Sequence, residues 1–369
     1  MKIFKKIEIS LSRFIIGLLT FKGDQTLVEE KSNIFNESNT QKILFLRQDR
    51  IGDLLISTPV LRILKKKFPQ VKMDILLGEH NYNAKDIAEP FVDSIYFYKK
   101  NIFAIFILLY KLKKQNYDII IDLFDEPSTT SSLLIKMVDP KYSVGLKKEK
   151  CFVYSHLVKL LRQDRYHIVI RTSMLMLPFN ISPFEEDLSL SYEISDIEIT
   201  QAENLLGVNK KNMIVGINLS GSDKLRFWGV ENNIEFINLL KQKYNNINIV
   251  VIGTKAYEAE LNKIKLATDV IVAPFVNSVR EYASILRVCN FIITPDTAAV
   301  HFASAFKIPT IPLFSSKTNG WKFAWLPFNN KYEPLFSDTG FIKDIQPKNV
   351  YIAFVKLHNQ TKESNELKF

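Results

Sequence analysis

The chain has 369 residues, of which 47% are hydrophobic and 24% are charged, and it carries a formal net charge of +10. This length exceeds what a single core usually serves, and the composition is that of a soluble globular protein, so we expect two α/β domains. The two cysteines, Cys151 and Cys289, lie far apart without metal-ligand companions, which indicates a reducing compartment. The positive charge permits nucleic acid, an anionic membrane surface or a phosphorylated substrate as partner, and does not choose among them.

Residues 1–22 predict a basic amphipathic helix. Large apolar residues recur there at alternating spacings of three and four, and five cations with one acid give the segment a net charge of +4. Such a helix either lies in a membrane interface or packs on the protein's own surface, and both alternatives stay open. The apolar run 14–21 is far shorter than the ~20 residues that span a bilayer, and no cleavage site of a secretory signal follows it. Residues 23–41 are expected to form a linker.

A strand, a charged loop and a helix follow the linker. Residues 43–46 form an apolar run typical of a strand buried on both faces, and a helix is expected from residue 53 to the proline at 69. In open α/β sheets, ligands bind outside the carboxyl ends of the strands, so the loop is expected at a functional site. Its charged residues are Arg47, Asp49, Arg50 and Asp53.

The rest of the first half predicts a parallel sheet. Strands are expected at 72–77 and 118–123, with a lysine-flanked apolar segment at 102–112 between them. This segment is interpreted as a buried helix rather than a membrane insert, because it is too short to span a bilayer and a strand follows directly. Residues 171–193, which contain two prolines, are the expected crossing between domains.

The second half repeats the pattern more clearly and predicts a second doubly wound sheet. Strands are expected at 214–219, 247–252, 270–273, 291–294 and 310–314. Helices are expected at 231–244, 256–266, 279–288 and 298–306, with a final helix at about 347–357.

Two loops of the second half have the chemistry of a phosphate site. Loop 220–228 follows a strand and supplies hydroxyls, free backbone amides and two cations, although a solvated basic turn is the structural alternative. Loop 295–301 also follows a strand and places Asp296 and Thr297 at a helix N-terminus, where amides point toward an anion. Ordinary helix capping would also explain these two residues.

Three further residues of the second half give weaker signals. Glu258 follows a strand and could accept hydrogen bonds from ribose hydroxyls, as an acidic residue does in dinucleotide folds, or it could face solvent. Asn277 opens a helix, and capping explains it equally well. His301 is either a site residue or a packed helix residue.

The sequence resembles the family 9 glycosyltransferases, the group that contains the lipopolysaccharide heptosyltransferases, at three separated motifs. The first is Arg-x-Asp-x-Ile-Gly-Asp, starting at Arg47 and followed by Leu-x-x-Thr-Pro-x-Leu. The second has small or hydroxyl residues and then a cation, here Arg226, two positions before a tryptophan. The third is Asp-Thr-Gly-x-x-His, in which Ala298 replaces the usual glycine.

This resemblance implies the GT-B arrangement, an α/β fold of two Rossmann-like doubly wound domains that face each other across a cleft. By that analogy, residues 1–41 are the amphipathic helix and linker, and residues 42–185 form the acceptor-binding domain. Residues 186–345 form the nucleotide-sugar-binding domain, and residues 346–369 form a helix that returns to the first domain.

The resemblance also implies roles for individual residues. Asp53 falls on the family's proposed catalytic base, which takes the proton of the attacking hydroxyl, although a carboxylate serving the helix dipole is the structural alternative. Asp49 is the second candidate base. Acceptor-binding or base-orienting roles fall to Arg47, Asp49, Arg50 and Gly52. Donor-binding roles fall to Ser220, Gly221, Ser222, Lys224, Arg226, Glu258, Asn277, Asp296, Thr297, Ala298 and His301.

No metal site and no cofactor are expected. The sequence has no Asp-x-Asp motif of the metal-dependent sugar-nucleotide transferases and no close pair of histidines. It also has no Gly-x-Gly-x-x-Gly, Walker loop or Gly-x-Ser-x-Gly. The sequence therefore lacks the motifs that are typical of dehydrogenases, nucleoside triphosphatases and serine hydrolases.

The predicted function is inverting, metal-independent transfer of heptose from ADP-heptose to a lipopolysaccharide core or related lipid-linked saccharide. The expected location is cytoplasmic. If residues 1–22 bind an anionic membrane surface, the protein is peripheral on the inner face of a bacterial inner membrane. The alternatives are a GT-B transferase of another nucleotide sugar for surface glycans and a non-catalytic sugar-nucleotide-binding relative. No nucleic-acid partner is expected, because the basic residues are spread along the chain.

Overall fold

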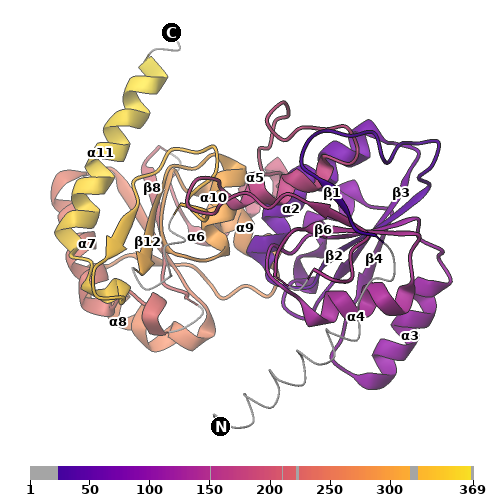
Figure 1. The fold of residues 1–369 in the computed structure, drawn as a ribbon. Coiled ribbons are helices and arrows are strands. Elements are labelled where there is room, and N and C mark those ends of the chain that lie inside the picture. Colours follow the sequence, from indigo (N-terminus) through magenta and orange to yellow (C-terminus); the bar gives the residue numbers. More distant parts are fainter. Residues whose placement is uncertain (1–23, 150, 210, 222–223, 316–322, 367–369) are drawn as a thin grey trace. The chain divides into compact units, whose positions relative to one another are not determined.

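The chain divides into two compact units in the computed structural model (Figure 1). Unit 1 contains the chain up to Arg162 together with Ile168–Leu188, and unit 2 contains Gln163–His167 and the chain from Ser189 onward. The amphipathic helix predicted at 1–22 lies outside the described residues. The structure describes residues 24–149, 151–209, 211–221, 224–315 and 323–366.

Unit 1 is built on seven parallel strands in the order β1-β7-β6-β5-β2-β3-β4. Residues 43–46 of the central strand are fully buried, as their continuous apolar run predicts for a sheet covered on both faces. The edge strand β1 lies inside the segment that the sequence predicts to be a linker. The strands are β1 (Thr26–Val28), β2 (Lys42–Arg47), β3 (Lys72–Leu77), β4 (Ser94–Phe97), β5 (Ile119–Asp122), β6 (Tyr142–Leu146) and β7 (His156–Val158).

Two helices of unit 1 cover one face of this sheet. Leu44 and Leu46 of β2 pack in one core cluster with Leu112 of α3 and Leu134 of α4. The α-helices are α2 (Ile51–Lys67), α3 (Ile102–Lys113), α4 (Thr129–Val138) and α5 (Ile168–Ser173). The 3-10 helices are η1 (Tyr82–Ile87), η2 (Glu89–Phe91) and η3 (Met174–Met176).

Helix α3 corrects one expectation. The apolar segment at 102–112 is helical as predicted, but it is buried on only one side. Leu108, Leu109 and Leu112 face the core, whereas Phe103 and Phe106 on the other side are 76% and 60% exposed. The segment is apolar around its whole circumference, so its sequence does not show which side lacks a covering element.

Unit 2 is built on six parallel strands in the order β10-β9-β8-β11-β12-β13. The strands are β8 (Met213–Asn218), β9 (Ile247–Ile252), β10 (Ile271–Val272), β11 (Phe291–Pro295), β12 (Thr310–Ser315) and β13 (Leu335–Ser337). The α-helices are α6 (Asp196–Leu206), α7 (Val230–Lys243), α8 (Glu258–Thr268), α9 (Val279–Val288), α10 (Ala298–Phe306) and α11 (Pro347–Glu366). The 3-10 helices are η4 (Lys224–Arg226), η5 (Lys255–Tyr257) and η6 (Ile342–Asp344).

Helix α11 packs within unit 2. Val350, Phe354 and Leu357 belong to the same core cluster as Phe236 of α7 and the strand residues of this sheet. Trp228 adds a hydrogen bond from its Nε1 to the Ile345 carbonyl, 2.8 Å away, just before α11. The return of this helix to the first domain stays a prediction.

The order of the strands reverses at one place in each sheet. With β1 left aside, both units have the order 3-2-1-4-5-6 when their strands are numbered along the chain, which confirms the predicted doubly wound α/β class. The reversal lies between β2 and β5 in unit 1 and between β8 and β11 in unit 2. Ligands of such sheets bind at this point, outside the carboxyl ends of the strands. No helix in the described part of the chain is both long and apolar enough to cross a membrane.

Candidate active site

Arg47 joins three segments at the reversal point of unit 1. Its side chain is only 2% exposed, and Nε donates to the Asp53 carbonyl at 2.9 Å, while Nη1 donates to the Leu123 carbonyl at 2.9 Å. Nη1 also lies 3.2 Å from Oδ2 of Asp49. A buried guanidinium with several fixed acceptors is held rigidly, so Arg47 fits the orienting role better than binding of a mobile acceptor.

A glycine allows the loop after β2 to lie close to the loop after β3. A Cβ atom at Gly78 would collide with the Gln48 carbonyl oxygen. Asn81 ties the same two strand ends together, because its Nδ2 donates to the Arg47 carbonyl at 2.7 Å and its Oδ1 accepts the Gly78 amide at 2.8 Å. The backbone that leads into the first motif is therefore held to the end of the neighbouring strand by these hydrogen bonds.

Asp53 is the third residue of α2, where its Oδ2 accepts the Arg50 amide at 3.2 Å. This is the capping geometry that the structural alternative predicts for one of the two carboxylate oxygens. Burial raises the pKa of Asp53 above its usual value, against the opposing effects of Arg47 and the Arg50 amide. Gly52, next to it, is buried in the first turn, and Arg50 is exposed.

The carboxyl of Asp49 also has a raised pKa. Its pKa is raised to about 7 as the net result of three main effects: burial raises the pKa most, the Arg47 guanidinium lowers it, and the charge of Asp53 raises it. Its Oδ1 is buried without a hydrogen-bond partner. A carboxyl whose pKa lies near neutrality is suited to proton transfer, because it is ionised at working pH and still basic enough to accept a proton. The pKa values of Asp49 and Asp53 are thus both shifted in the direction that suits a general base.

The structure adds charged residues that the sequence analysis missed. Asp122 ends β5 with no exposed surface and pairs with Lys148, whose Nζ lies 3.1 Å from its Oδ2. Asp125 pairs with Arg171 at 2.9 Å, and its charge contributes to the raised pKa of Asp53. Both lie at the carboxyl end of a strand, where ligands of open α/β sheets bind. The same rule predicted a site after the strand at 43–46, and applying it to the predicted strand at 118–123 would have found Asp122 and Asp125.

A hollow of about 170 Å³ lies at the carboxyl ends of the strands in unit 1. Aromatic rings, hydroxyls, an amide, a carboxylate and a lysine line it, which is the mixture that binds a saccharide with an anionic group. Nε2 of Gln48 is buried without a hydrogen-bond partner. The lining residues are Gln48, Gly78, Glu79, His80, Tyr98, Lys100, Phe124, Ser128 and Thr130.

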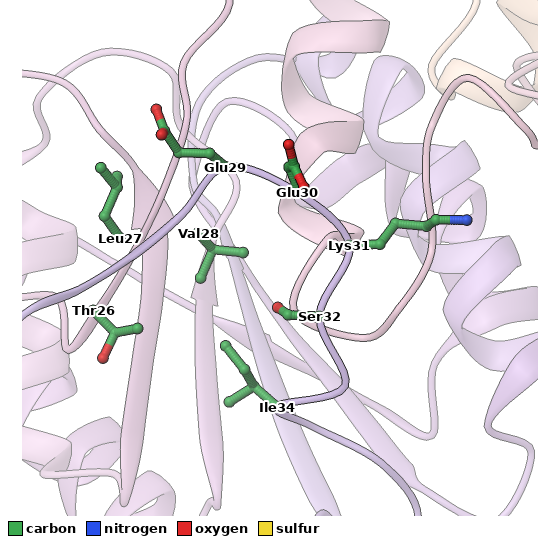
Figure 2. Close-up of a pocket in the computed structure, with 8 residues that line it drawn as sticks. All are labelled: Thr26, Leu27, Val28, Glu29, Glu30, Lys31, Ser32 and Ile34. Atoms are coloured by element: carbon green, nitrogen blue, oxygen red, sulfur yellow. The ribbon is translucent and has the colours of Figure 1, made fainter.

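A second hollow, of about 410 Å³, lies beside β1 (Figure 2). Figure 2 shows that its eight lining residues all come from the single stretch between Thr26 and Ile34. None of the candidate site residues lines it. Its size therefore does not make it the active site, because the reactive side chains lie at the reversal point instead.

Asn218 joins the strand ends at the reversal point of unit 2. Its Nδ2 donates to Oγ1 of Thr294 at 2.9 Å and to Oγ1 of Thr297 at 3.3 Å, which connects the ends of β8 and β11. Oγ of Ser220 accepts the Thr254 amide at 3.0 Å and so connects β8 to the loop after β9. Asn218 is a further residue that the sequence analysis did not single out, although it lies near the end of the strand predicted at 214–219 and ends β8.

Arg226 brings the two predicted donor loops together. Its Nη1 donates to the Asp296 carbonyl at 2.6 Å, and its Nη2 lies 3.3 Å from Oδ2 of Asp296. A Cβ atom at Gly221 would lie 2.6 Å from Cβ of Arg226 and 2.7 Å from its carbonyl oxygen, so only glycine allows this close approach. Ser222 and the side chain of Lys224 lie outside the described residues.

Thr297 is the N-cap of α10, and its Oγ1 accepts the Ala299 amide at 3.3 Å. Ala298 begins the helix and is not among the residues with positive φ, so the backbone here does not require the glycine usual in the family motif. The amides of the first turn of α10 thus lie beside Asp296 and near the Arg226 guanidinium. A helix N-terminus next to a cation is a favourable place for phosphate oxygens.

The other predicted donor residues differ in exposure. The ring of His301 is buried against Trp325, with its Nδ1 unpartnered, and burial lowers its pKa to about 3, so it is neutral. Glu258 is exposed at the start of α8. Asn277 is exposed, and its amide donates to Oε2 of Glu281 at 3.1 Å in the cap of α9. These contacts agree with the packing and capping alternatives and test no donor role.

Comparisons with a family model, with related sequences and with solved structures all point to one family. The family described as "Glycosyltransferase family 9 (heptosyltransferase)" matches residues 105–349. "Lipopolysaccharide heptosyltransferase 3" of Escherichia coli K12 is 24% identical over 297 residues, which cover 74% of this chain and 82% of the relative. Two solved structures show the same fold, which is of the GT-B type.

The first is a glycosyltransferase family 9 protein from Veillonella parvula, with a TM-score of 0.73, 17% identity and coverage of 86% of this chain and 97% of that one. The second is the E. coli heptosyltransferase WaaC with ADP-2-deoxy-2-fluoro heptose. It has a TM-score of 0.67 and 16% identity, and the alignment covers 88% of this chain and 100% of that one.

Proposed function

Because this chain belongs to glycosyltransferase family 9, we propose that it transfers a heptose from ADP-heptose to a lipopolysaccharide core or a related lipid-linked saccharide. The family assignment establishes a glycosyltransferase. The names of its relatives support the choice of donor, since one is a lipopolysaccharide heptosyltransferase and another is a heptosyltransferase with an ADP-heptose analogue.

The observation that carries the chemistry is the pair of half-buried carboxyls at the reversal point of unit 1. Asp53 is the proposed base, and Asp49, whose pKa is raised to about 7, is the second candidate. The base removes the proton of the acceptor hydroxyl, the hydroxyl oxygen bonds to the anomeric carbon, and the bond from that carbon to ADP breaks. ADP leaves with the electron pair, and a single displacement of this kind inverts the anomeric centre.

The leaving diphosphate needs positive charge, and unit 2 supplies it without a metal ion in this proposal. Arg226 and the amides at the start of α10 would stabilise the charge that grows on ADP. Lys224, Ser220, Gly221 and Ser222 belong to the same loop. Glu258, Asn277 and His301 complete the proposed donor site.

The acceptor is proposed to bind in unit 1. The hollow of about 170 Å³ offers Tyr98 and Phe124 for packing against a sugar ring and Lys100 for an anionic group. The lipid anchor of such an acceptor favours a cytoplasmic enzyme held peripherally at the inner face of a bacterial inner membrane. Residues 1–22 are the proposed membrane contact, because of their basic amphipathic pattern.

Binding and product analysis test this function. We expect isothermal titration to show binding of ADP-heptose and ADP in preference to UDP and GDP sugars. Transfer is expected to continue in excess EDTA, and the product linkage is expected to have the anomeric configuration opposite to that of the donor. Preference for another nucleotide would support a different donor, and binding without any transfer would support the non-catalytic alternative.

A further inference from the structure

Helix α3 carries an apolar face that stays exposed among the described residues of unit 1. Large side chains lie at positions i, i+1, i+4, i+5 and i+8 of this helix, so they form one continuous stripe. Their exposed fractions range from 58% to 76%. We call this surface the α3 patch; it consists of Ile102, Phe103, Phe106, Ile107 and Tyr110.

The neighbouring helix also carries exposed apolar side chains. α4 packs beside α3, as Figure 1 shows for unit 1, and its Leu133 and Met137 are each 39% exposed. Among the described residues, other exposed apolar side chains such as Ile197 and Leu266 come from different helices of unit 2. Contiguous exposed apolar surface on a soluble protein usually marks a binding surface, whereas isolated side chains do not.

The charge around the patch identifies the kind of partner. Residues 99–114 contain no acidic side chain, and exposed lysines flank the apolar stripe at both ends of the helix. An apolar stripe with a cationic rim is complementary to a bilayer with anionic headgroups, where the stripe enters the acyl boundary and the ammonium groups meet the phosphates. The flanking lysines are Lys99, Lys100, Lys111, Lys113 and Lys114.

We propose that the α3 patch docks unit 1 onto an anionic membrane surface, as a contact separate from residues 1–22. Two other occupants are disfavoured by charge. Residues 1–22 carry a net charge of +4 and would meet a rim of like charge. A second copy of the same patch would place two lysine rims against each other.

The position of the patch also suits the proposed acceptor. Lys100 belongs to the lysine rim and also lines the hollow of about 170 Å³. A bilayer bound to α3 would therefore lie next to the place where a lipid-linked saccharide is proposed to bind. This last point rests on the proposed function, whereas membrane docking of α3 does not.

Sedimentation of the full chain with vesicles tests the docking. Vesicles of phosphatidylcholine mixed with phosphatidylglycerol are expected to bind the protein more strongly than phosphatidylcholine alone. The Phe103→Ser/Phe106→Ser variant is expected to bind the anionic vesicles about tenfold more weakly, because two apolar side chains no longer enter the interface. The matched control is Ile197→Ser/Leu266→Ser, two side chains that are 71% and 88% exposed on unit 2, and it should bind like the wild type.

A second variant separates charge from apolar burial. Lys111→Glu/Lys113→Glu is expected to reduce binding to the anionic vesicles and its sensitivity to salt, while binding to phosphatidylcholine changes little. These lysines are exposed, so this variant keeps the test valid if the double serine variant does not fold. Both variants should retain ADP binding and transfer to a lipid-free acceptor, which separates this inference from the proposed function.

Three results would overturn the docking. Equal recovery of wild type and both variants with anionic vesicles would show that α3 does not touch lipid. Unchanged vesicle binding with faster protease cleavage near residue 23 in the serine variant would show that residues 1–22 cover the patch. A dimer in size-exclusion chromatography that the serine variant dissociates, again with unchanged vesicle binding, would assign the patch to self-association.

Discussion

His301 shows how the protonation state of a residue depends on packing that its position in the sequence does not reveal. The sequence places it in a family motif next to the helix start that is proposed to bind phosphate. The structure buries its ring, lowers its pKa to about 3 and leaves its Nδ1 without a partner. A neutral imidazole of this kind cannot offer a charge to a diphosphate, although it can still offer a hydrogen bond.

The burial of His301 predicts a loss of stability in acid. Its pKa is about 6.5 in the unfolded chain and about 3 in the folded chain, so below pH 6.5 the unfolded chain binds a proton that the folded chain excludes. The free energy of unfolding should therefore fall as the pH falls from 6.5 toward 3. Between pH 7 and pH 5, the wild type should lose about 1–2 kcal/mol more than His301→Phe.

Urea unfolding followed by tryptophan fluorescence measures this difference. The three tryptophans all lie after residue 189 in the sequence, so the signal reports on unit 2. Exposed His80 in unit 1 gives a control, because His80→Phe should keep the acid sensitivity of the wild type. Parallel pH profiles for the wild type and His301→Phe would contradict the argument.

At the scale of elements, the connection between the two predicted donor loops also depends on tertiary contacts. Loop 220–228 and loop 295–301 were each predicted to bind phosphate, because each follows a strand and contains hydroxyl side chains. Their direct connection through Arg226 and Asp296 was not predicted, because side chains that are 70 residues apart meet only when β8 and β11 become neighbours. The glycine at 221 allows that connection.

Gly221→Ala tests the connection of these loops. The added Cβ would lie 2.6 Å from Cβ of Arg226, so the loop must move and Arg226 must leave its place beside Asp296. We expect ADP binding to weaken about tenfold, which corresponds to about 1.4 kcal/mol. Isothermal titration measures the change.

Gly207→Asn is the matched control for a glycine substitution in unit 2. Gly207 is the C-cap of α6 with φ of +63°, a conformation that asparagine tolerates, and a Cβ atom there meets nothing within 4 Å. ADP binding should not change. Equal affinity of Gly221→Ala and the wild type would show that the loop does not need this close approach.

The periodicity of apolar residues predicted most of the long helices and strands, but it did not predict which of their faces pack against other elements. The strand at 72–77 and the helices at 279–288 and 298–306 were predicted with their observed bounds. Helix α3 was predicted as a buried helix, and half of it is exposed, because periodicity alone does not reveal whether a neighbouring element exists. Strand β1 was missed, since three residues inside a polar segment give no periodic signal.

At the scale of the whole molecule, the strand-end rule explains why much of the site could be predicted. Candidate residues of both units lie at the reversal points of doubly wound sheets, where ligands bind outside the carboxyl ends of the strands. The carboxylates Asp122 and Asp125 were missed because the rule was not applied to the strand that precedes them. Their ion pairs with Lys148 and Arg171 depend on tertiary contacts that no local pattern shows.

The central claim is that unit 1 supplies the base and unit 2 holds the donor. Asp53→Asn in the full chain tests it, with ADP-heptose binding and heptosyl transfer measured on the same preparation, and with exposed Glu235→Gln of α7 as control. We predict unchanged affinity for ADP-heptose and transfer reduced about 10²- to 10⁴-fold, the usual effect of removing a general base, while the control keeps both. Wild-type turnover by Asp53→Asn would contradict the assignment of this carboxylate.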